Sequence, residues 1–230
     1  TNFKYNSNLS TKSKLTLETN VLNTIISYNN ETLENFTGMF RHSALTGLID
    51  NTDTSILSNI TKVKMYKFIT PTLNEGLKYT LNFNNALFNP HSGHNAGGGG
   101  IISSTGFKIN NDLSVSEHFL DDDGAGNIRV YYLSGTVRVY TSSSYGTVNY
   151  TTGQIVLTSA HITSISNVDG AASTQVRIFA TPDSNDIIPV RNQILEIDTA
   201  NSSVSGGADE IESGSSQAGT SYTTTSSYSY

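Results

Sequence analysis

The sequence predicts a mixed α+β protein in which N-terminal helices precede a mainly antiparallel β domain and an extended polar C-terminal tail. Three observations lead to this prediction. Apolar residues first recur at helical three- and four-residue steps. Short alternating runs separated by turn residues then follow, and from residue 199 onward Ser, Thr, Gly and Tyr dominate. We therefore divide the chain into a helical segment at 1–60, a β-rich domain at 61–198 and a low-complexity tail at 199–230.

The first helix is predicted over residues 15–28, where the spacing aligns apolar side chains in one stripe. Its members are Leu15, Val21, Leu22, Ile25 and Ile26. Either Ser13 or Thr11 is a suitable N-cap residue, because a short side-chain oxygen can accept from a free backbone N–H. The stripe is also a candidate assembly surface, although packing on the protein's own core explains such a stripe equally well.

A second helical stretch is predicted over residues 33–49. Its apolar members are Leu33, Phe36, Phe40, Ala44, Leu45, Leu48 and Ile49. Gly38 interrupts the stretch, and glycine weakens a helix interior. We expect a helix, a break near Gly38 and a second helix.

The β-rich domain is predicted from short alternating runs bounded by turn residues. Residues 62–69 place lysines on a solvated strand face, and residues 89–100, NPHSGHNAGGGG, read as an open Gly-rich loop. Turns are expected at Ser134-Gly135 and Tyr145-Gly146, among others. The strand candidates are 77–83, 107–109, 115–120, 128–133, 136–140, 147–150, 154–157, 176–180 and 193–197.

The polar tail contains too little apolar surface to offset the entropy of ordering it. We expect it to be held by a surface outside the domain, with Tyr222, Tyr228 and Tyr230 as anchors. Deletion of residues 201–230 is then expected to leave the domain folded and to weaken assembly.

Composition and hydropathy argue against two kinds of partner, nucleic acid and membrane. A net charge of −6 with 13 basic residues supplies no clustered positive field for nucleic acid. No apolar run approaches the roughly 18 residues of a membrane span, so we expect no membrane insertion. The start, Thr1-Asn2-Phe3-Lys4, has neither a signal-peptide pattern nor an initiator Met. We expect a processed product or a piece of a longer polypeptide.

Three groups of residues were weighed as chemical sites. Asp121-Asp122-Asp123-Gly124-Ala125-Gly126-Asn127 resembles a calcium loop, but Ala125 and Tyr132 stand where oxygen ligands belong, so a hairpin turn is favoured. His91 and His94 lack a third protein ligand, and the following glycines make a soft frame for zinc.

Asp50 and Asp53, with Ser55, suggest paired carboxylates, but their position between a helix and a strand favours caps and turns. The sequence contains neither G-x-S-x-G nor H-E-x-x-H. We therefore predict no enzyme, no catalytic or metal-binding residue and no cofactor.

Two stretches resemble one phage protein family. The first spans residues 25–67 and carries Tyr28, Leu33, Phe36, Phe40-Arg41-His42-Ser43, Leu45, Ile49-Asp50, Asp53-Thr54-Ser55-Ile56 and Asn59. The second spans residues 119–198; it opens on FLDDDGAGNIR and closes on PDSNDIIPVRNQIL. Together they resemble the C-terminal part of the baseplate wedge subunit encoded by gene six of T-even-like contractile-tailed phages. The Gly-rich loop and the Tyr-rich end match nothing in that family.

The resemblance implies a structural subunit of the virion's tail baseplate, present in the host cytoplasm during assembly. Its partners would be a second copy of itself, other wedge subunits and neighbouring wedges, with dimers linking wedges into a ring around the hub. The alternative is a receptor- or glycan-binding β module of a phage fibre or bacterial surface protein, suggested by Tyr- and Asn-rich strands. A glycoside hydrolase using acidic pairs is a distant third.

Overall fold

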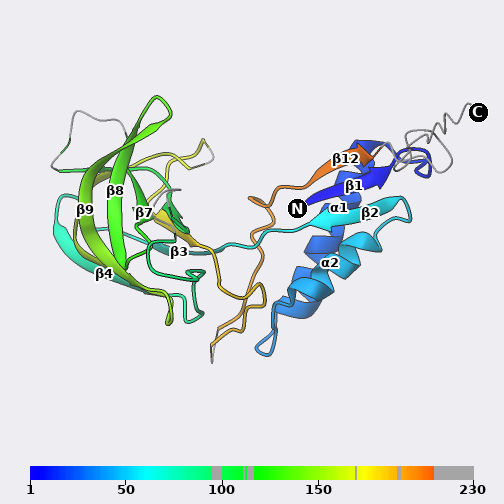
Figure 1. The fold of residues 1–230 in the computed structure, drawn as a ribbon, viewed down its shortest axis with the longest axis horizontal. Coiled ribbons are helices and arrows are strands. Elements are labelled where there is room, and N and C mark those ends of the chain that lie inside the picture. The colour runs from blue at the N-terminus through cyan, green and yellow to red at the C-terminus, as the bar shows by residue number, and fades with distance from the viewer. Residues whose placement is uncertain (95–99, 111, 113–116, 169, 191–192, 210–230) are drawn as a thin grey trace, which may run out of the picture. The chain divides into compact units, whose positions relative to one another are not determined.

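The computed structural model describes residues 1–94, 100–110, 112, 117–168, 170–190 and 193–209. These form two compact units: unit 1 comprises Thr1–Lys62 with the chain from Ile188 onward, and unit 2 is Val63–Ile187. The chain contains a few helices and many strands, and most of the strand pairs are antiparallel. The predicted α+β class with mainly antiparallel strands is therefore confirmed (Figure 1). Among the described residues no helix has the length and apolar character to cross a membrane.

Unit 1 is built on a three-stranded sheet in the order β12-β1-β2. The strands are β1 (Asn2–Asn6), β2 (Ile56–Ile60), antiparallel to β1, and β12 (Ser205–Asp209), parallel to β1. The helices are α1 (Lys14–Tyr28), the π-helical turn η1 (Asn29–Leu33) and α2 (His42–Asp50). Figure 1 shows both helices running along this sheet.

The core of unit 1 lies between the helices and one face of its sheet. Phe3 and Tyr5 of β1 are buried while the alternate residues Asn2 and Lys4 are exposed, as the two-residue period of a strand requires. The buried helical residues are Leu17, Val21, Ile25, Tyr28, Leu45 and Ile49. Ser13 accepts a hydrogen bond from the Thr16 backbone N–H at 3.2 Å, so the predicted cap at Ser13 is confirmed.

The boundaries of unit 1 differ from the predicted segments. The segment 1–60 contains two strands as well as helices, and the predicted tail supplies β12. Ser205–Asp209 has no apolar pattern; its order comes from backbone pairing with β1 and from Gly206, which lies against the buried ring of Phe3. Residues 210–230 lie outside the described part of the chain.

Unit 2 contains two antiparallel sheets that share one core. The larger has the order β4-β10-β9-β8-β7 with β6 also paired to β10, and the smaller is β3-β11-β5. The strands are β3 (Met65–Ile69), β4 (Gly76–Asn82), β5 (Ile102–Ser104), β6 (Phe107–Ile109), β7 (Phe119–Asp122), β8 (Asn127–Ser134), β9 (Val137–Asn149), β10 (Gln154–Ile165) and β11 (Val176–Ala180). Buried side chains of both sheets form a single apolar cluster, with Phe107, Ile155 and Ile178 at its centre among the least exposed.

Most predicted strands are present, but two local predictions are wrong. Residues 115–116 of the predicted strand 115–120 and residues 95–99 of the predicted Gly-rich loop lie outside the described residues. The expected turn at Tyr145-Gly146 lies inside the continuous strand β9, because glycine lets the β10 backbone at Val156 approach where a side chain would overlap it. Residues 193–197 form no strand; Ile197 instead donates its N–H to Asn29 Oδ1 at 2.7 Å. The turn at Ser134-Gly135 is confirmed, with Gly135 at φ +63° between β8 and β9.

Candidate assembly surface

The predicted stripe on α1 divides between two sides of the helix. Val21 and Ile25 are buried, with Leu17 and Tyr28 at four- and three-residue steps beside them. They belong to the core of unit 1. These two members of the predicted assembly surface therefore serve the packing of their own unit.

The other three members, Leu15, Leu22 and Ile26, follow one another at seven- and four-residue steps and share a second side of α1. Leu15 is 72% exposed, whereas Leu22 and Ile26 are half-buried. Glu18 and Asn29 continue this side at three-residue steps. Glu18 Oε1 accepts from the Gly206 N–H at 2.8 Å, and Asn29 Oδ1 accepts from the Ile197 N–H at 2.7 Å. The C-terminal part of unit 1 therefore contacts this side of α1, and of the three apolar members only Leu15 is exposed.

The most exposed large apolar side chain among the described residues is Phe36, at 75%. It sits in a turn, not in the helix expected from its spacing. Asn35 holds this turn: its Nδ2 donates to the Thr32 carbonyl at 2.8 Å, and its Oδ1 accepts from the Thr37 N–H at 3.1 Å. We call residues 34–38 the Phe36 tip.

Gly38 closes the Phe36 tip. Its N–H donates to the Asn35 carbonyl at 3.0 Å, and a Cβ placed on it would come within 2.7 Å of the Thr32 carbonyl oxygen. The predicted break near Gly38 is confirmed, and its cause is this close approach of backbone. Asn35 and Gly38 are both turn-forming residue types, and they are the sequence signal for this turn.

The Phe36 tip leads through Phe40 into α2, which exposes two apolar side chains beside the polar Ser43 and Asp50. Leu45 and Ile49 face the core, while Ala44 and Leu48, four residues apart, are exposed. Unit 1 thus presents scattered apolar side chains to solvent: Leu9, Leu15, Phe36, Leu48, Leu57, Ile60, Ile188 and Ile194. The predicted anchors Tyr222, Tyr228 and Tyr230 lie outside the described residues.

The carboxylates considered for acid and base chemistry have structural partners. Asp53 Oδ2 lies 2.6 Å from the Lys12 ammonium, and its Oδ1 accepts from the Ser55 N–H at 3.0 Å. The hydrogen bond from Lys12, with those from Ser55, lowers the pKa of Asp53 to about 2. Asp50 Oδ1 accepts from Asn59 Nδ2 at 2.7 Å. Both side chains therefore order the connection between α2 and β2.

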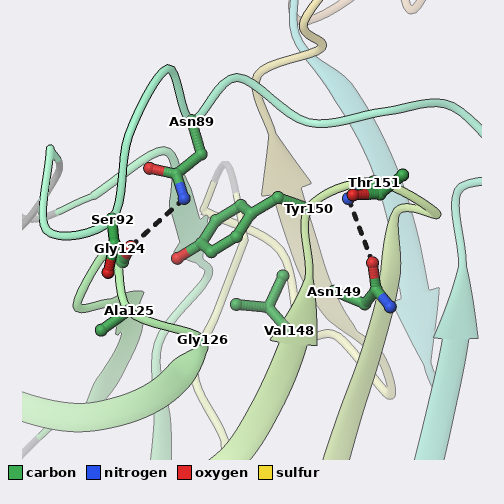
Figure 2. A pocket seen from close by; sticks show the side chains of 9 residues that line it. All are labelled: Asn89, Ser92, Gly124, Ala125, Gly126, Val148, Asn149, Tyr150 and Thr151. Atoms are coloured by element: carbon green, nitrogen blue, oxygen red, sulfur yellow. Dashed lines mark hydrogen bonds between the residues drawn. The ribbon is translucent and has the colours of Figure 1, made fainter.

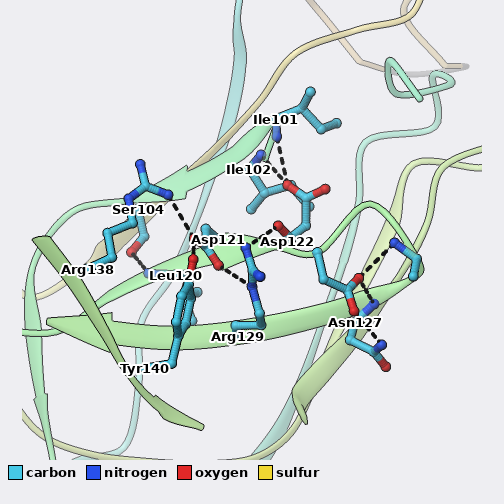
Figure 3. Close-up of polar contacts among 12 residues, drawn as sticks. Ile101, Ile102, Ser104, Leu120, Asp121, Asp122, Asn127, Arg129, Arg138 and Tyr140 are labelled. Carbon is cyan, nitrogen blue, oxygen red and sulfur yellow. Dashed lines mark hydrogen bonds and ion pairs between the residues drawn. The ribbon is translucent and has the colours of Figure 1, made fainter. Parts of the chain in front are cut away.

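The aspartate run of unit 2 forms a hairpin turn with each carboxylate bonded to protein donors (Figure 3). Asp121 contacts two arginines, and Asp122 Oδ1 accepts from the Ile101 and Ile102 N–H groups at 2.7 and 2.9 Å. Asp123 Oδ1 accepts from the N–H groups of its own turn. The turn agrees with the hairpin favoured from the sequence.

Beside this turn is an open depression of about 410 Å³ lined by neutral groups (Figure 2). Tyr150 points its hydroxyl to Asp122 Oδ2 at 2.7 Å, and burial together with that carboxylate raises the pKa of Tyr150. Asn89 Nδ2 donates to the Gly124 carbonyl at 3.2 Å. The Tyr150 hydroxyl and Asn89 Nδ2 thus stabilise the walls of the depression, whereas Asn89 Oδ1 is buried without a hydrogen-bond partner among the described residues.

Comparison with known families gives a match that covers the N-terminal segment of unit 1 and runs into β3 of unit 2. Residues 1–68 match the family described as Baseplate structural protein gp6, C-terminal domain III. No curated protein matches the chain. The matched residues include α1, the Phe36 tip, α2 and the first stretch of the resemblance noted in the sequence; the second stretch, residues 119–198, lies beyond the match.

Proposed function

Because residues 1–68 place this chain among the gp6-type baseplate proteins, structural proteins of the phage tail baseplate, we propose that it forms dimers that link wedges of a contractile tail into a ring around the hub. The partners would be a second copy of the chain and other wedge subunits. The observation that carries the proposal is the Phe36 tip, which lies within the matched residues and exposes its aromatic ring.

A hydrogen-bonded tip suits a protein interface for a physical reason. An aromatic ring buries a large area on binding while losing few rotatable bonds, and such rings dominate interface energies. The bonds from Asn35 and Gly38 order the tip in advance, which lowers the entropy lost on association. Leu15 and Leu48 add apolar area in the same unit.

The proposed role involves no catalysis. Asp50 and Asp53, the acidic pair considered from the sequence, are engaged with Asn59, Ser55 and Lys12. A carboxyl group whose pKa is lowered to about 2, as in Asp53, is ionised at neutral pH and makes a poor general acid. These contacts support a structural role for both residues.

Substitution of Phe36 by alanine tests the proposal. We expect the purified chain to self-associate at micromolar concentration, and Phe36→Ala to weaken that association roughly 30-fold, the effect of about 2 kcal/mol at an interface anchor. Light scattering coupled to size exclusion measures both. Leu133→Ala, which trims an exposed apolar residue of unit 2, is the control and should change nothing.

Two results would contradict this proposal. One is a wild-type chain that stays strictly monomeric over the whole concentration range. The other is Phe36→Ala that associates as well as the wild type, because the proposal makes the exposed Phe36 ring an anchor of the interface.

A second candidate function rests on the outer face of the sheet β3-β11-β5. Tyr66 and Phe68 of β3 are exposed there, and Phe179 of β11 lies beside Tyr66 with ring centroids 5.8 Å apart. Arg177 adds a guanidinium 5.9 Å from the Tyr66 ring centroid. Exposed aromatic rings with a donor among them favour the stacking of a sugar ring, the receptor- or glycan-binding role considered above.

Glycan-array binding tests this candidate. If unit 2 binds a glycan, Phe68→Ala should reduce the bound signal at least tenfold, because the ring supplies exposed stacking surface. Val137→Ala, at an exposed residue of β9, is the control. Absence of binding to every glycan, or binding unaffected by Phe68→Ala, would count against the second candidate.

A further inference from the structure

Two histidine rings of unit 2 converge on one point in a solvent-exposed turn. His91 Nε2 and His94 Nδ1 are 3.1 Å apart, and the ring planes meet at 85° with centroids 4.8 Å apart. Both residues are exposed. Neither lies in residues 1–68, which match the baseplate family, and the proposed assembly role does not use them.

The turn that carries the two rings is fixed to the hairpin between β7 and β8. The His94 N–H donates to the His91 carbonyl at 3.0 Å, and the Gly93 N–H donates to the Gly124 carbonyl at 2.9 Å. Gly93 adopts φ +78°, which favours glycine, and the Phe88 ring packs edge-on against His94 at 5.5 Å. The frame is therefore more ordered than the glycines after His94 suggest.

The hydrogen bonds also define which ring nitrogen carries a lone pair. His91 Nδ1 lies 3.2 Å from the Ser92 carbonyl oxygen, which can only accept, so His91 carries its proton on Nδ1. His91 Nε2 then accepts a hydrogen bond from the Nδ1–H of His94. A backbone carbonyl that holds the second ring nitrogen in this way is the usual support of a metal-binding histidine.

The spacing of the two nitrogens fits a metal ion. A tetrahedral ion bound to two imidazoles at about 2.0–2.1 Å separates the nitrogens by roughly 3.3 Å, close to the spacing in the turn. Binding requires the His94 proton to move from Nδ1 to Nε2 through solvent, and both exposed rings to turn slightly so that the two lone pairs converge on the ion. No oxidant or further reactant takes part.

We propose that His91 and His94 bind a divalent late transition metal ion, with solvent at its remaining positions. Imidazole nitrogen suits Cu²⁺, Ni²⁺ and Zn²⁺, and the expected order of affinity places Cu²⁺ first. Within the described residues no group of three or more His, Cys, Asp or Glu side chains is arranged for a metal. The ion therefore has open coordination positions and exchanges with solvent, unlike a four-ligand structural zinc.

Titration of the full chain with CuCl₂, NiCl₂ and ZnCl₂ by calorimetry at pH 7.5 tests this proposal. We expect one saturable site per chain, and at least tenfold weaker binding in His91→Ala and in His94→Ala. His161→Ala, which removes an imidazole of β10, should bind as the wild type does. Because His91 and His94 are exposed, both variants should keep the wild-type circular dichroism spectrum.

A second measurement locates the ion independently of affinity. Paramagnetic Cu²⁺ should broaden the imidazole proton resonances of His91 and His94 at substoichiometric addition and leave those of His42 and His161 sharp. The proposal fails if no saturable site exists, or if the double variant His91→Ala/His94→Ala binds as tightly as the wild type. Neither result bears on self-association through unit 1, so the two proposals are tested separately.

Discussion

Replacing Asp121 by alanine should destabilise unit 2 by roughly 3–5 kcal/mol, the range measured when one partner of a buried ion pair is removed. The carboxylate is fully buried. Its Oδ1 accepts from Arg129 Nε at 2.9 Å, and its Oδ2 lies 2.8 Å from an Arg138 guanidinium nitrogen. One negative charge thus joins two positive charges on neighbouring strands (Figure 3).

The arginines cannot both leave when the carboxylate is removed. Arg129 is 13% exposed and its guanidinium lies 4.3 Å from the Tyr140 ring centroid, while the Tyr140 hydroxyl also donates to Asp121 at 2.9 Å. Arg138 is 35% exposed and can turn toward water. Most of the expected loss therefore comes from Arg129, left buried without its counter-charge.

Urea unfolding, monitored through the hydrogen exchange of the β7–β9 amides, measures this loss of stability within unit 2. Asp183→Ala removes an exposed carboxylate of the same unit and is the control, expected to change the free energy of unfolding by less than about 0.5 kcal/mol. Replacing Asp121, Arg129 and Arg138 together by apolar residues should restore much of the loss, because no unpaired charge then remains. A loss below about 1 kcal/mol in Asp121→Ala would show that water reaches the pair.

Local sequence signals predicted the features that depend on neighbouring residues. The helical period located α1, Ser13 capped it, and Ser134-Gly135 made the β8–β9 turn. The period did not separate the two sides of α1, because Val21 and Leu22 are adjacent in sequence and only about 100° apart around the helix. Which of them faces the core depends on the sheet beneath, and that information is not local.

Two features were not recognised from the spacing of apolar residues. Phe36 has helical spacing, but the bonds of Asn35 and the close approach at Gly38 outweigh it and make an exposed tip. The glycines after His94 suggested a soft loop, whereas the Gly124 carbonyl, thirty residues later, fixes the turn. In each case the deciding contacts are made by backbone groups or a polar side chain, which the spacing of apolar residues does not record.

The strand β12 is the largest such feature, and it changes the expected effect of truncation. The sequence alone predicted that residues 201–230 could be deleted without loss of the fold. Ser205–Asp209 instead pairs along the whole of β1, and Gly206 covers the buried ring of Phe3. Ending the chain at Ala200 should therefore cost several kcal/mol, a large part of the ~5–15 kcal/mol that stabilises a domain.

Ending the chain at Asp209 is the matched comparison, because it keeps β12 and removes the tail tyrosines. We expect unit 1 to remain folded in the chain that ends at Asp209, with its α1 amides protected from hydrogen exchange. In the chain that ends at Ala200 we expect that protection to be lost. If both truncations leave α1 equally protected, β12 does not stabilise the unit. Self-association of the Asp209 variant then tests Tyr222, Tyr228 and Tyr230 as anchors without disturbing the sheet.

The two adjacent glycines of β12 test the same contact without shortening the chain. A Cβ on Gly206 would lie 2.7 Å from Phe3 Cζ in the core, so Gly206→Ala should cost roughly 1–3 kcal/mol. A Cβ on Gly207, on the opposite face, would meet only Lys4 Nζ at 3.2 Å, the free end of a flexible side chain. Gly207→Ala should therefore be nearly neutral. Equal effects of the two substitutions would mean that β12 does not pack on Phe3, because only the packed face distinguishes one glycine from the other.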